Sequence, residues 1–167
     1  SRADLRLRLP SQRYFEDSAD SGLSPRDFGI LMHRAFEHAD TEKEIAEAVT
    51  QMEADASLSS DDAVRLRRMI ADALADPVAR EWFDGSWQRV RNEQEIVIPG
   101  SSSLRRPDRV MIDGERAVVV DYKFGEHDPA RYRRQIADYC ALLRQMGHPR
   151  TEGYLWFVRL GKIERVE

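Results

Sequence analysis

Residues 107–123 decide the fold of this chain, and they read Pro-Asp-Arg-Val-Met-Ile-Asp-Gly-Glu-Arg-Ala-Val-Val-Val-Asp-Tyr-Lys. Two runs within this stretch, Arg109–Ile112 and Ala117–Asp121, are rich in the apolar and β-branched residues that favour strands. The Asp113-Gly114 pair between them is typical of a tight hairpin turn, because both residues readily take the left-handed backbone that such turns need. The stretch therefore predicts two antiparallel strands, the second of them buried.

The hairpin places two carboxylates at its open end. Asp108 comes just before the first strand and Asp121 ends the second, so the turn folds them back beside each other. Neighbouring carboxylates cannot both stay ionised and unpaired without cost, and a divalent cation relieves the repulsion. Oxygen ligands suit Mg²⁺ or Mn²⁺ better than zinc. Lys123 lies two residues after Asp121 and so points to the same face of the strand, where an ammonium group can help to hold a phosphate.

Each of these residues also has an ordinary structural interpretation. Asp108 could pair with Arg106 or Arg109 at the surface, and Lys123 could be the solvated end of a strand. For any one residue alone, the ordinary interpretation is the better one. Taken together with the hairpin between them, the residues favour a site.

The elements on either side complete a mixed α/β pattern. In the second half we expect a strand over Arg91–Ile98, a turn over 99–103, a helix from Asp128-Pro129 to Met146, and strands over Tyr154–Val158 and Lys162–Val166. The first half is helical, with starts at Ser24, Thr41 and Ser60, ends near Ala39 and Ala75 for the first and third helices, and a short helical turn that carries Trp82 and Phe83. A short strand over Leu5–Leu9 precedes the helices.

Composition limits the class of protein. The 167 residues suit one domain, which we divide into a strand and linker (1–23), a helical part (24–86) and an α/β core (87–167). A single cysteine excludes a disulfide scaffold and four-cysteine metal sites, and no apolar run approaches the about 20 residues that span a membrane. The net charge of −4 argues against a strongly basic nucleic-acid binder, although the residues after 86 carry 15 basic against 12 acidic side chains.

Four elements in order resemble a known nuclease family. Pro107-Asp108 followed by Asp121-Tyr122-Lys123 resembles the signature of the PD-(D/E)XK nuclease superfamily, whose restriction-endonuclease-like core has the order helix, three strands, helix, strand. The RecB-like branch adds a histidine on an upstream helix, here within Gly29–Glu37, and a Gln-x-x-x-Tyr element, here Gln135–Tyr139. The resemblance covers about residues 24–160 and implies the nuclease module of a bacterial RecB- or AddA-type helicase-nuclease.

The resemblance assigns roles to particular residues. It implies that His33, Asp108 and Asp121 ligate the metal together with the backbone carbonyl of Tyr122, and that Lys123 is the catalytic lysine. The spacing on the upstream helix is compatible, because a glycine four residues before the histidine shares its helical face and lets that face approach the sheet. A lone histidine is otherwise more often a partly buried side chain bonded to the backbone.

The remaining candidates are less sharply defined. The family places a glutamate on the preceding strand, where Glu93 and Glu95 share a face; we choose Glu93, and a solvated strand face is the alternative. Gln135 and Tyr139 face the same way off their helix and could contact the site, although Tyr139 could equally be core. The candidates for contacts to DNA phosphates are Arg131, Arg133 and Arg134.

The resemblance implies a cytoplasmic bacterial DNA exonuclease that depends on Mg²⁺, with Mn²⁺ as a substitute. Since the chain begins with Ser1 rather than Met, we expect a fragment of a longer helicase-nuclease that acts in double-strand-break repair and recombination with a second subunit. No Gly-x-x-x-x-Gly-Lys-Ser/Thr loop is present, so ATP would act only through the helicase portion. The alternatives are a catalytically inactive DNA-binding or docking module and another superfamily nuclease, such as a junction resolvase or restriction enzyme.

Overall fold

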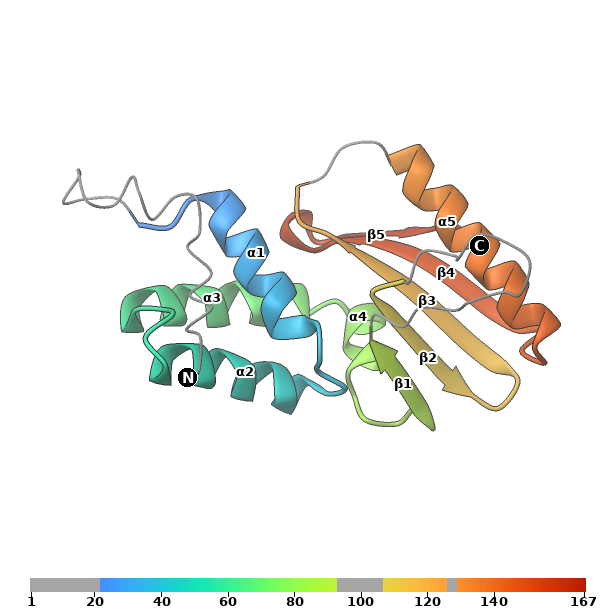
Figure 1. The fold of residues 1–167 in the computed structure, drawn as a ribbon, viewed down its shortest axis with the longest axis horizontal. Coiled ribbons are helices and arrows are strands. Elements are labelled where there is room, and N and C mark those ends of the chain that lie inside the picture. The colour runs from blue at the N-terminus through green and yellow to red at the C-terminus, as the bar shows by residue number, and fades with distance from the viewer. Residues whose placement is uncertain (1–21, 93–106, 126–128) are drawn as a thin grey trace, which may run out of the picture.

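A mixed five-stranded sheet forms the centre of the computed structural model, which describes residues 22–92, 107–125 and 129–167 (Figure 1). The strands follow each other in chain order across the sheet: β1 (Arg89–Asn92), β2 (Arg109–Asp113), β3 (Arg116–Lys123), β4 (Arg150–Phe157) and β5 (Lys162–Arg165). Only β3 and β4 are parallel, and all other neighbours are antiparallel. The predicted α/β class is therefore confirmed.

The hairpin between β2 and β3 has the register that its turn residues predict. Asp113 pairs with Arg116 next to the turn, and Arg109 pairs with Val120 at the open end. Gly114 has a φ of +60°, the left-handed backbone that glycine takes without strain. Because the strands are antiparallel and in this register, the residues just beyond the pair at the open end, Asp108 and Asp121, lie opposite each other.

The helices of the first half pack together against one face of the sheet, and the helix between β3 and β4 lies on the other face (Figure 1). The first four are α1 (Pro25–Phe36), α2 (Glu42–Ala54), α3 (Ser60–Ala73) and α4 (Pro77–Trp82), and α5 (Pro129–Gln145) makes the crossover from β3 to β4. The predicted helix starts agree with the structure to within one residue. Ser24 and Asp27 form a full capping box, whereas the Glu44 carboxylate accepts from the Asp40 N–H (3.0 Å) and not from the Thr41 N–H.

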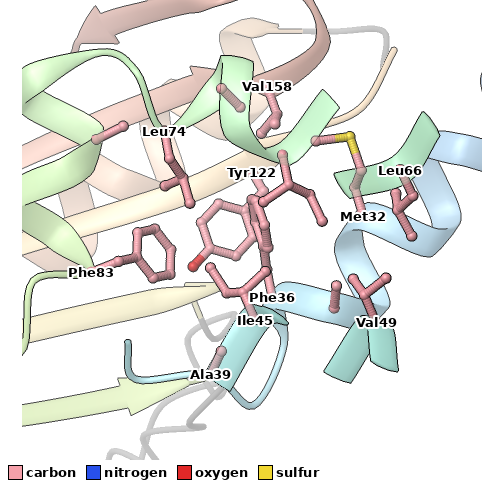
Figure 2. Close-up of a cluster of buried hydrophobic side chains, with 14 of the residues drawn as sticks. Met32, Phe36, Ala39, Ile45, Val49, Leu66, Leu74, Phe83, Tyr122 and Val158 are labelled. Carbon is pink, nitrogen blue, oxygen red and sulfur yellow. The ribbon is translucent and has the colours of Figure 1, made fainter. Parts of the chain in front are cut away.

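Two separate cores lie on the two faces. The larger core joins the helical layer to the sheet through aromatic rings. Phe36 lies flat against Trp156 with centroids 5.6 Å apart. Tyr122 meets Phe36 edge-on, and Figure 2 shows both side chains within this core. The smaller core lies under α5 and contains Val119, Ile136 and Leu155. The alternation of β3 between these cores decides which of its polar residues face α5.

A glycine lets α5 sit close to the sheet. Gly153 lies in β4 beneath the helix, and a Cβ atom added there would collide with Ile136 and would be 2.8 Å from Cys140 Sγ. No real Cβ tolerates such an approach, so β4 needs glycine here.

The predicted strands and helices agree with the structure except at their ends. β4 begins at Arg150, four residues before the predicted start, because Arg150 and Thr151 already pair with β3. α1 ends at Phe36, short of the predicted end at Ala39, and α3 ends two residues early. The predicted strand over Leu5–Leu9, the turn over 99–103 and the strand residues after Asn92 lie outside the described residues. The helices of the described part are all too short or too polar to cross a membrane.

Candidate active site

The two predicted carboxylates meet at the open end of the β2–β3 hairpin and are held by the backbone. The Asp108 N–H donates to Asp121 Oδ1 (3.0 Å), and the Tyr122 N–H donates to Asp108 Oδ2 (2.7 Å). Both residues are buried, at 8% and 2% of their full exposure. Each carboxylate therefore uses one oxygen to accept a hydrogen bond from the backbone across the hairpin, and its other oxygen is left to face the site.

The second oxygen of each carboxylate faces a basic side chain. Asp108 Oδ1 lies 3.5 Å from His33 Nε2, and Asp121 Oδ2 lies 3.8 Å from Lys123 Nζ. The structure thus brings together the four residues that the sequence singled out. The ordinary interpretation of Lys123 as a solvated strand end is wrong, because this residue is only 4% exposed.

The acidic pair and Lys123 lie on the α5 side of the sheet. Val119 of β3 belongs to the core under α5, whereas Val120 and Tyr122 belong to the core under the helical layer. Since side chains alternate along a strand, Asp121 and Lys123 point to the α5 face. His33 comes from the opposite layer, so the site lies where the two layers meet at the end of the sheet.

His33 reaches the carboxylates because α1 comes close to the end of β3. A Cβ atom added to Gly29, one turn before His33, would be 3.0 Å from Phe124 Cβ and 3.1 Å from the Phe124 carbonyl oxygen. Phe124 also meets the imidazole edge-on, with centroids 5.7 Å apart. On its outer side His33 Nδ1 lies 3.9 Å from Glu37 Oε2. The glycine thus permits the contact that the sequence predicted, and two acidic neighbours flank the ring.

Lys123 has a partner that sequence analysis missed. Its Nζ lies 3.1 Å from the centroid of the Tyr132 ring, at the end of the first turn of α5. A desolvated ammonium group over an aromatic face is worth about 2 kcal/mol. Tyr132 is half-buried and lies at the edge of the core under α5. The signal available in the sequence was its position three residues before Gln135, on the turn that faces the site.

Arg109 does not pair with Asp108, and that alternative is wrong. Its guanidinium is fully buried on the other face, where it stacks on the Phe83 ring at 4.0 Å. It donates to the carbonyl oxygens of Ala39 (2.6 Å), Asp40 (2.7 Å) and Trp82 (2.5 Å). Arg109 therefore fastens the helical layer to the sheet next to the site. The other alternative partner, Arg106, lies outside the described residues.

Tyr122 contributes its backbone to the site and its side chain to the core. Its N–H holds Asp108, while its ring packs among Phe36 and Trp156 on the helical side. Burial of the hydroxyl group raises its pKa well above the ordinary value.

A pocket of about 370 Å³ opens at this end of the sheet. It is lined by residues from α1, both strands of the hairpin and α5: Arg26, Gly29, Ile30, His33, Asp108, Tyr122, Lys123, Phe124 and Tyr132. Its basic side chains outnumber its carboxylates, so an anionic group is the natural occupant.

The donor set fits a hard divalent cation, although three ligands are not already assembled. Asp108 and Asp121 supply carboxylate oxygens, the ligands that Mg²⁺ and Mn²⁺ prefer, and His33 adds one nitrogen. In the described part of the chain, no three His, Cys, Asp or Glu side chains lie close enough to hold a metal as they stand. Small side-chain rotations or a further ligand would complete the set.

The remaining predicted residues that the structure describes lie outside the pocket lining. Tyr139 is buried in the core under α5, where burial raises the pKa of its hydroxyl group, and Gln135 is half-buried one turn before it. Arg133 is occupied, because its guanidinium makes two bonds to Glu164 (2.7 and 3.0 Å). Arg131 and Arg134 are exposed on α5. The two glutamate candidates, Glu93 and Glu95, lie outside the described residues.

Comparison with known proteins identifies the family. A model of the PD-(D/E)XK nuclease superfamily matches residues 2–167, and the chain therefore belongs to this superfamily. The order of helix, three strands, helix and strand around the acidic pair is consistent with its restriction-endonuclease-like fold. Membership indicates a hydrolase that cleaves nucleic acid with the help of divalent metal ions. A search of the curated proteins gave no match.

Proposed function

We propose that this chain is an exonuclease module that hydrolyses DNA phosphodiester bonds with Mg²⁺. One observation carries the proposal. The two buried carboxylates are fixed by each other's strand and turn their remaining oxygens toward His33 and Lys123 at the mouth of a pocket. A structural ion-pair network has no need to gather these groups at the edge of a cavity, whereas a hydrolytic site does.

The residues that would hold the metal are His33, Asp108 and Asp121, together with the backbone carbonyl of Tyr122. A bound divalent ion supplies a water of lowered pKa and neutralises charge on the attacked phosphate. The two carboxylates keep their positions through backbone donors. Binding therefore costs the protein little reorganisation beyond the side chain of His33, which is 36% exposed and able to adjust.

Lys123 is the residue that acts on the substrate. Its ammonium group lies in a dry position between Asp121 and the ring of Tyr132. There it can orient the attacking water and stabilise the negative charge that develops on the phosphate oxygens. Tyr132 limits the positions available to the amine, so that Lys123 is already placed when substrate arrives.

Further assignments follow from the family resemblance. Gln135 and Tyr139 would act beside the site from α5, and Glu93 would add a carboxylate from the strand before the hairpin. Arg131 and Arg134 would contact the DNA backbone without sequence preference. The same resemblance favours a RecB-like module of a bacterial, cytoplasmic helicase-nuclease in double-strand-break repair. ATP would be used only by its helicase portion, and a second subunit would complete the complex.

One observation favours an alternative. Because the described residues hold no preassembled set of three metal-ligating side chains, the chain could serve as an inactive DNA-binding or docking module of the same complex. The buried Lys123 beside Asp121 argues against it, since a docking module gains nothing from an ammonium group in that position.

Cleavage of end-labelled DNA tests the proposal. Linear single- and double-stranded substrates would be incubated at low salt with Mg²⁺, Mn²⁺ or EDTA, and circular single-stranded DNA would be added to separate exonuclease from endonuclease action. We expect metal-dependent release of short labelled products from the linear substrates. The activity should be lost in Asp121→Asn and Lys123→Met. It should survive in Arg150→Ala, which removes an exposed charge at the far end of β4.

The outcomes separate the candidates. Cleavage of circular DNA would make the enzyme an endonuclease. Absence of cleavage with every metal, while DNA is still bound, would support the docking module. Cleavage that survives both Asp121→Asn and Lys123→Met would place the reaction elsewhere in the chain.

A further inference from the structure

One arginine lines the pocket and a second lies beside a residue of its lining, and neither was among the predicted DNA contacts. Arg26 lines the pocket from the first turn of α1. Arg159 lies on the short 3-10 helix η2 (Val158–Leu160), which directly follows β4. Because Phe157 of β4 pairs with Lys123 of β3, the chain leaves β4 at the same end of the sheet as the site.

The side chain of Arg159 runs along the junction between α1 and the end of β3. A Cβ atom added to Gly29, which lines the pocket, would be 3.9 Å from Arg159 Cδ. A Cβ atom added to Gly125 would be 3.5 Å from Arg159 Nη1. The guanidinium group therefore lies beside the residues that follow Lys123, on the α1 side of the pocket.

Within the part of the chain that the structure describes, no acidic residue pairs with either guanidinium group. Asp27, the immediate neighbour of Arg26, is buried and accepts instead from the N–H (2.9 Å) and Oγ (2.7 Å) of Ser24. Other arginines of the chain are paired, as Arg133 is with Glu164 and Arg144 with Glu167. Two exposed guanidinium groups that have no acidic partner among the described residues, and that lie beside a metal-type site, complement a polyanion.

We infer that Arg26 and Arg159 bind backbone phosphates of the DNA strand whose scissile phosphate lies in the pocket. The inference rests on the proposed function and extends it, because it makes the substrate run along the α1 side of the sheet end, between α1 and η2. A guanidinium group can donate two parallel hydrogen bonds to a phosphate, and contacts to phosphates carry no information about the base sequence. The strand is therefore held without sequence preference, and the α1 side, not only α5, belongs to the binding surface.

Binding measured without cleavage tests this inference. A fluorescein-labelled single-stranded oligonucleotide would be titrated with the chain in EDTA, and anisotropy would give Kd over a range of salt concentrations. We expect Arg26→Ala and Arg159→Ala each to raise Kd several-fold at low salt. Each should also reduce the slope of log K against log salt by about 0.7, the value for one lost phosphate contact on single-stranded DNA.

Matched variants exclude a general effect of charge. Arg150→Ala removes the same charge at the opposite end of the sheet and should leave the slope almost unchanged. Arg26→Lys and Arg159→Lys keep the charge and should keep most of the slope. All five variants alter exposed side chains and should unfold at the same temperature as the wild type, because surface substitutions of this kind change stability little.

The inference and the proposed function fail in different ways. If the wild type cleaves DNA but Arg26→Ala and Arg159→Ala bind DNA with the same Kd and salt dependence as Arg150→Ala, the two arginines do not contact the strand. The proposed nuclease function is then unaffected. If both variants lose affinity and salt dependence while the wild type cleaves nothing, the arginine contacts stand and the nuclease is wrong. No measurable DNA binding by the wild type at low salt would overturn the inference.

Discussion

Replacing Arg109 by alanine should destabilise the protein more than any surface substitution. This buried guanidinium bonds the carbonyl oxygens of Ala39, Asp40 and Trp82 and stacks on Phe83. Alanine leaves three acceptors without this donor. Each buried carbonyl oxygen left without a donor costs about 1–3 kcal/mol. The Asp40 carbonyl is the most exposed of the three, so water can replace Arg109 there, and the cost comes from the other two. We therefore expect a loss of about 4 kcal/mol in the free energy of unfolding.

Urea denaturation followed by tryptophan fluorescence measures this loss. For a chain of this size the free energy of unfolding falls by about 2 kcal/mol per molar urea, so Arg109→Ala should lower the midpoint by about 2 M. Arg89→Ala is the matched control, because Arg89 is an exposed arginine on the neighbouring strand β1 and should change stability by less than about 0.5 kcal/mol. Arg109→Lys keeps the charge but loses the planar set of donors of the guanidinium group. Its urea midpoint should lie between those of Arg109→Ala and Arg89→Ala.

A small shift would refute the reasoning. If the midpoint of Arg109→Ala lies within about 0.3 M of the wild type, the bonds from Arg109 do not fasten the helical layer to the sheet. In that case the position of His33 on α1 must depend on the apolar core and on the contact between His33 and Asp108.

Three further predictions concern the site and the tyrosines. Tyr132→Leu should lower kcat by up to about 30-fold with little change in KM, because it removes a contact between a desolvated ammonium group and a ring that is worth about 2 kcal/mol. Tyr132→Phe keeps the ring and should keep the wild-type kcat. If both variants are as active as the wild type, Tyr132 does not position Lys123. Gly29→Val should reduce the cleavage rate strongly, because the valine side chain collides with Phe124 and moves His33 away from Asp108. Ile30→Val on the same turn should keep the wild-type rate, and the circular dichroism spectrum of both variants should be unchanged. Absorbance at 295 nm should show Tyr122, Tyr139 and Tyr154 still protonated at pH 10, because burial raises each pKa, that of Tyr154 to about 12. Since these groups ionise near pH 10 once unfolded, the folded state should lose stability as the pH rises from about 10 to 12, and a native spectrum of free tyrosines at pH 10 would contradict this.

Local rules in the sequence were enough to predict the acidic pair. The turn at Asp113-Gly114 sets the register of its two strands, and the register alone places Asp108 opposite Asp121. The period of a strand then puts Lys123 on the same face. His33 was predicted from the family resemblance, and Gly29 was compatible with that role because it permits the close approach of α1 that the structure has at Phe124.

Contacts that depend on the three-dimensional arrangement of the layers were not predictable in the same way. Arg109 follows an aspartate directly, yet strand alternation turns it to the opposite face, where its partners are carbonyl groups 27 to 70 residues away in the chain. The ring of Tyr132 meets Lys123 only because α5 crosses the sheet above the end of β3. Arg133 looked available for DNA, but the edge strand β5 brings Glu164 to it. Such partners follow from the packing of whole elements.

The backbone bonds between the two carboxylates have a consequence for the order in which the site is assembled during folding. Asp108 and Asp121 each receive an N–H from the hairpin to which they belong, so a chain that has zipped β2 onto β3 in the native register already carries both acids in their final places. Lys123 is fixed when α5 lays Tyr132 over it, and His33 arrives only when the helical layer docks. A partly folded chain therefore holds the acidic pair with Lys123 on the same strand but without His33, which joins them when the helical layer docks.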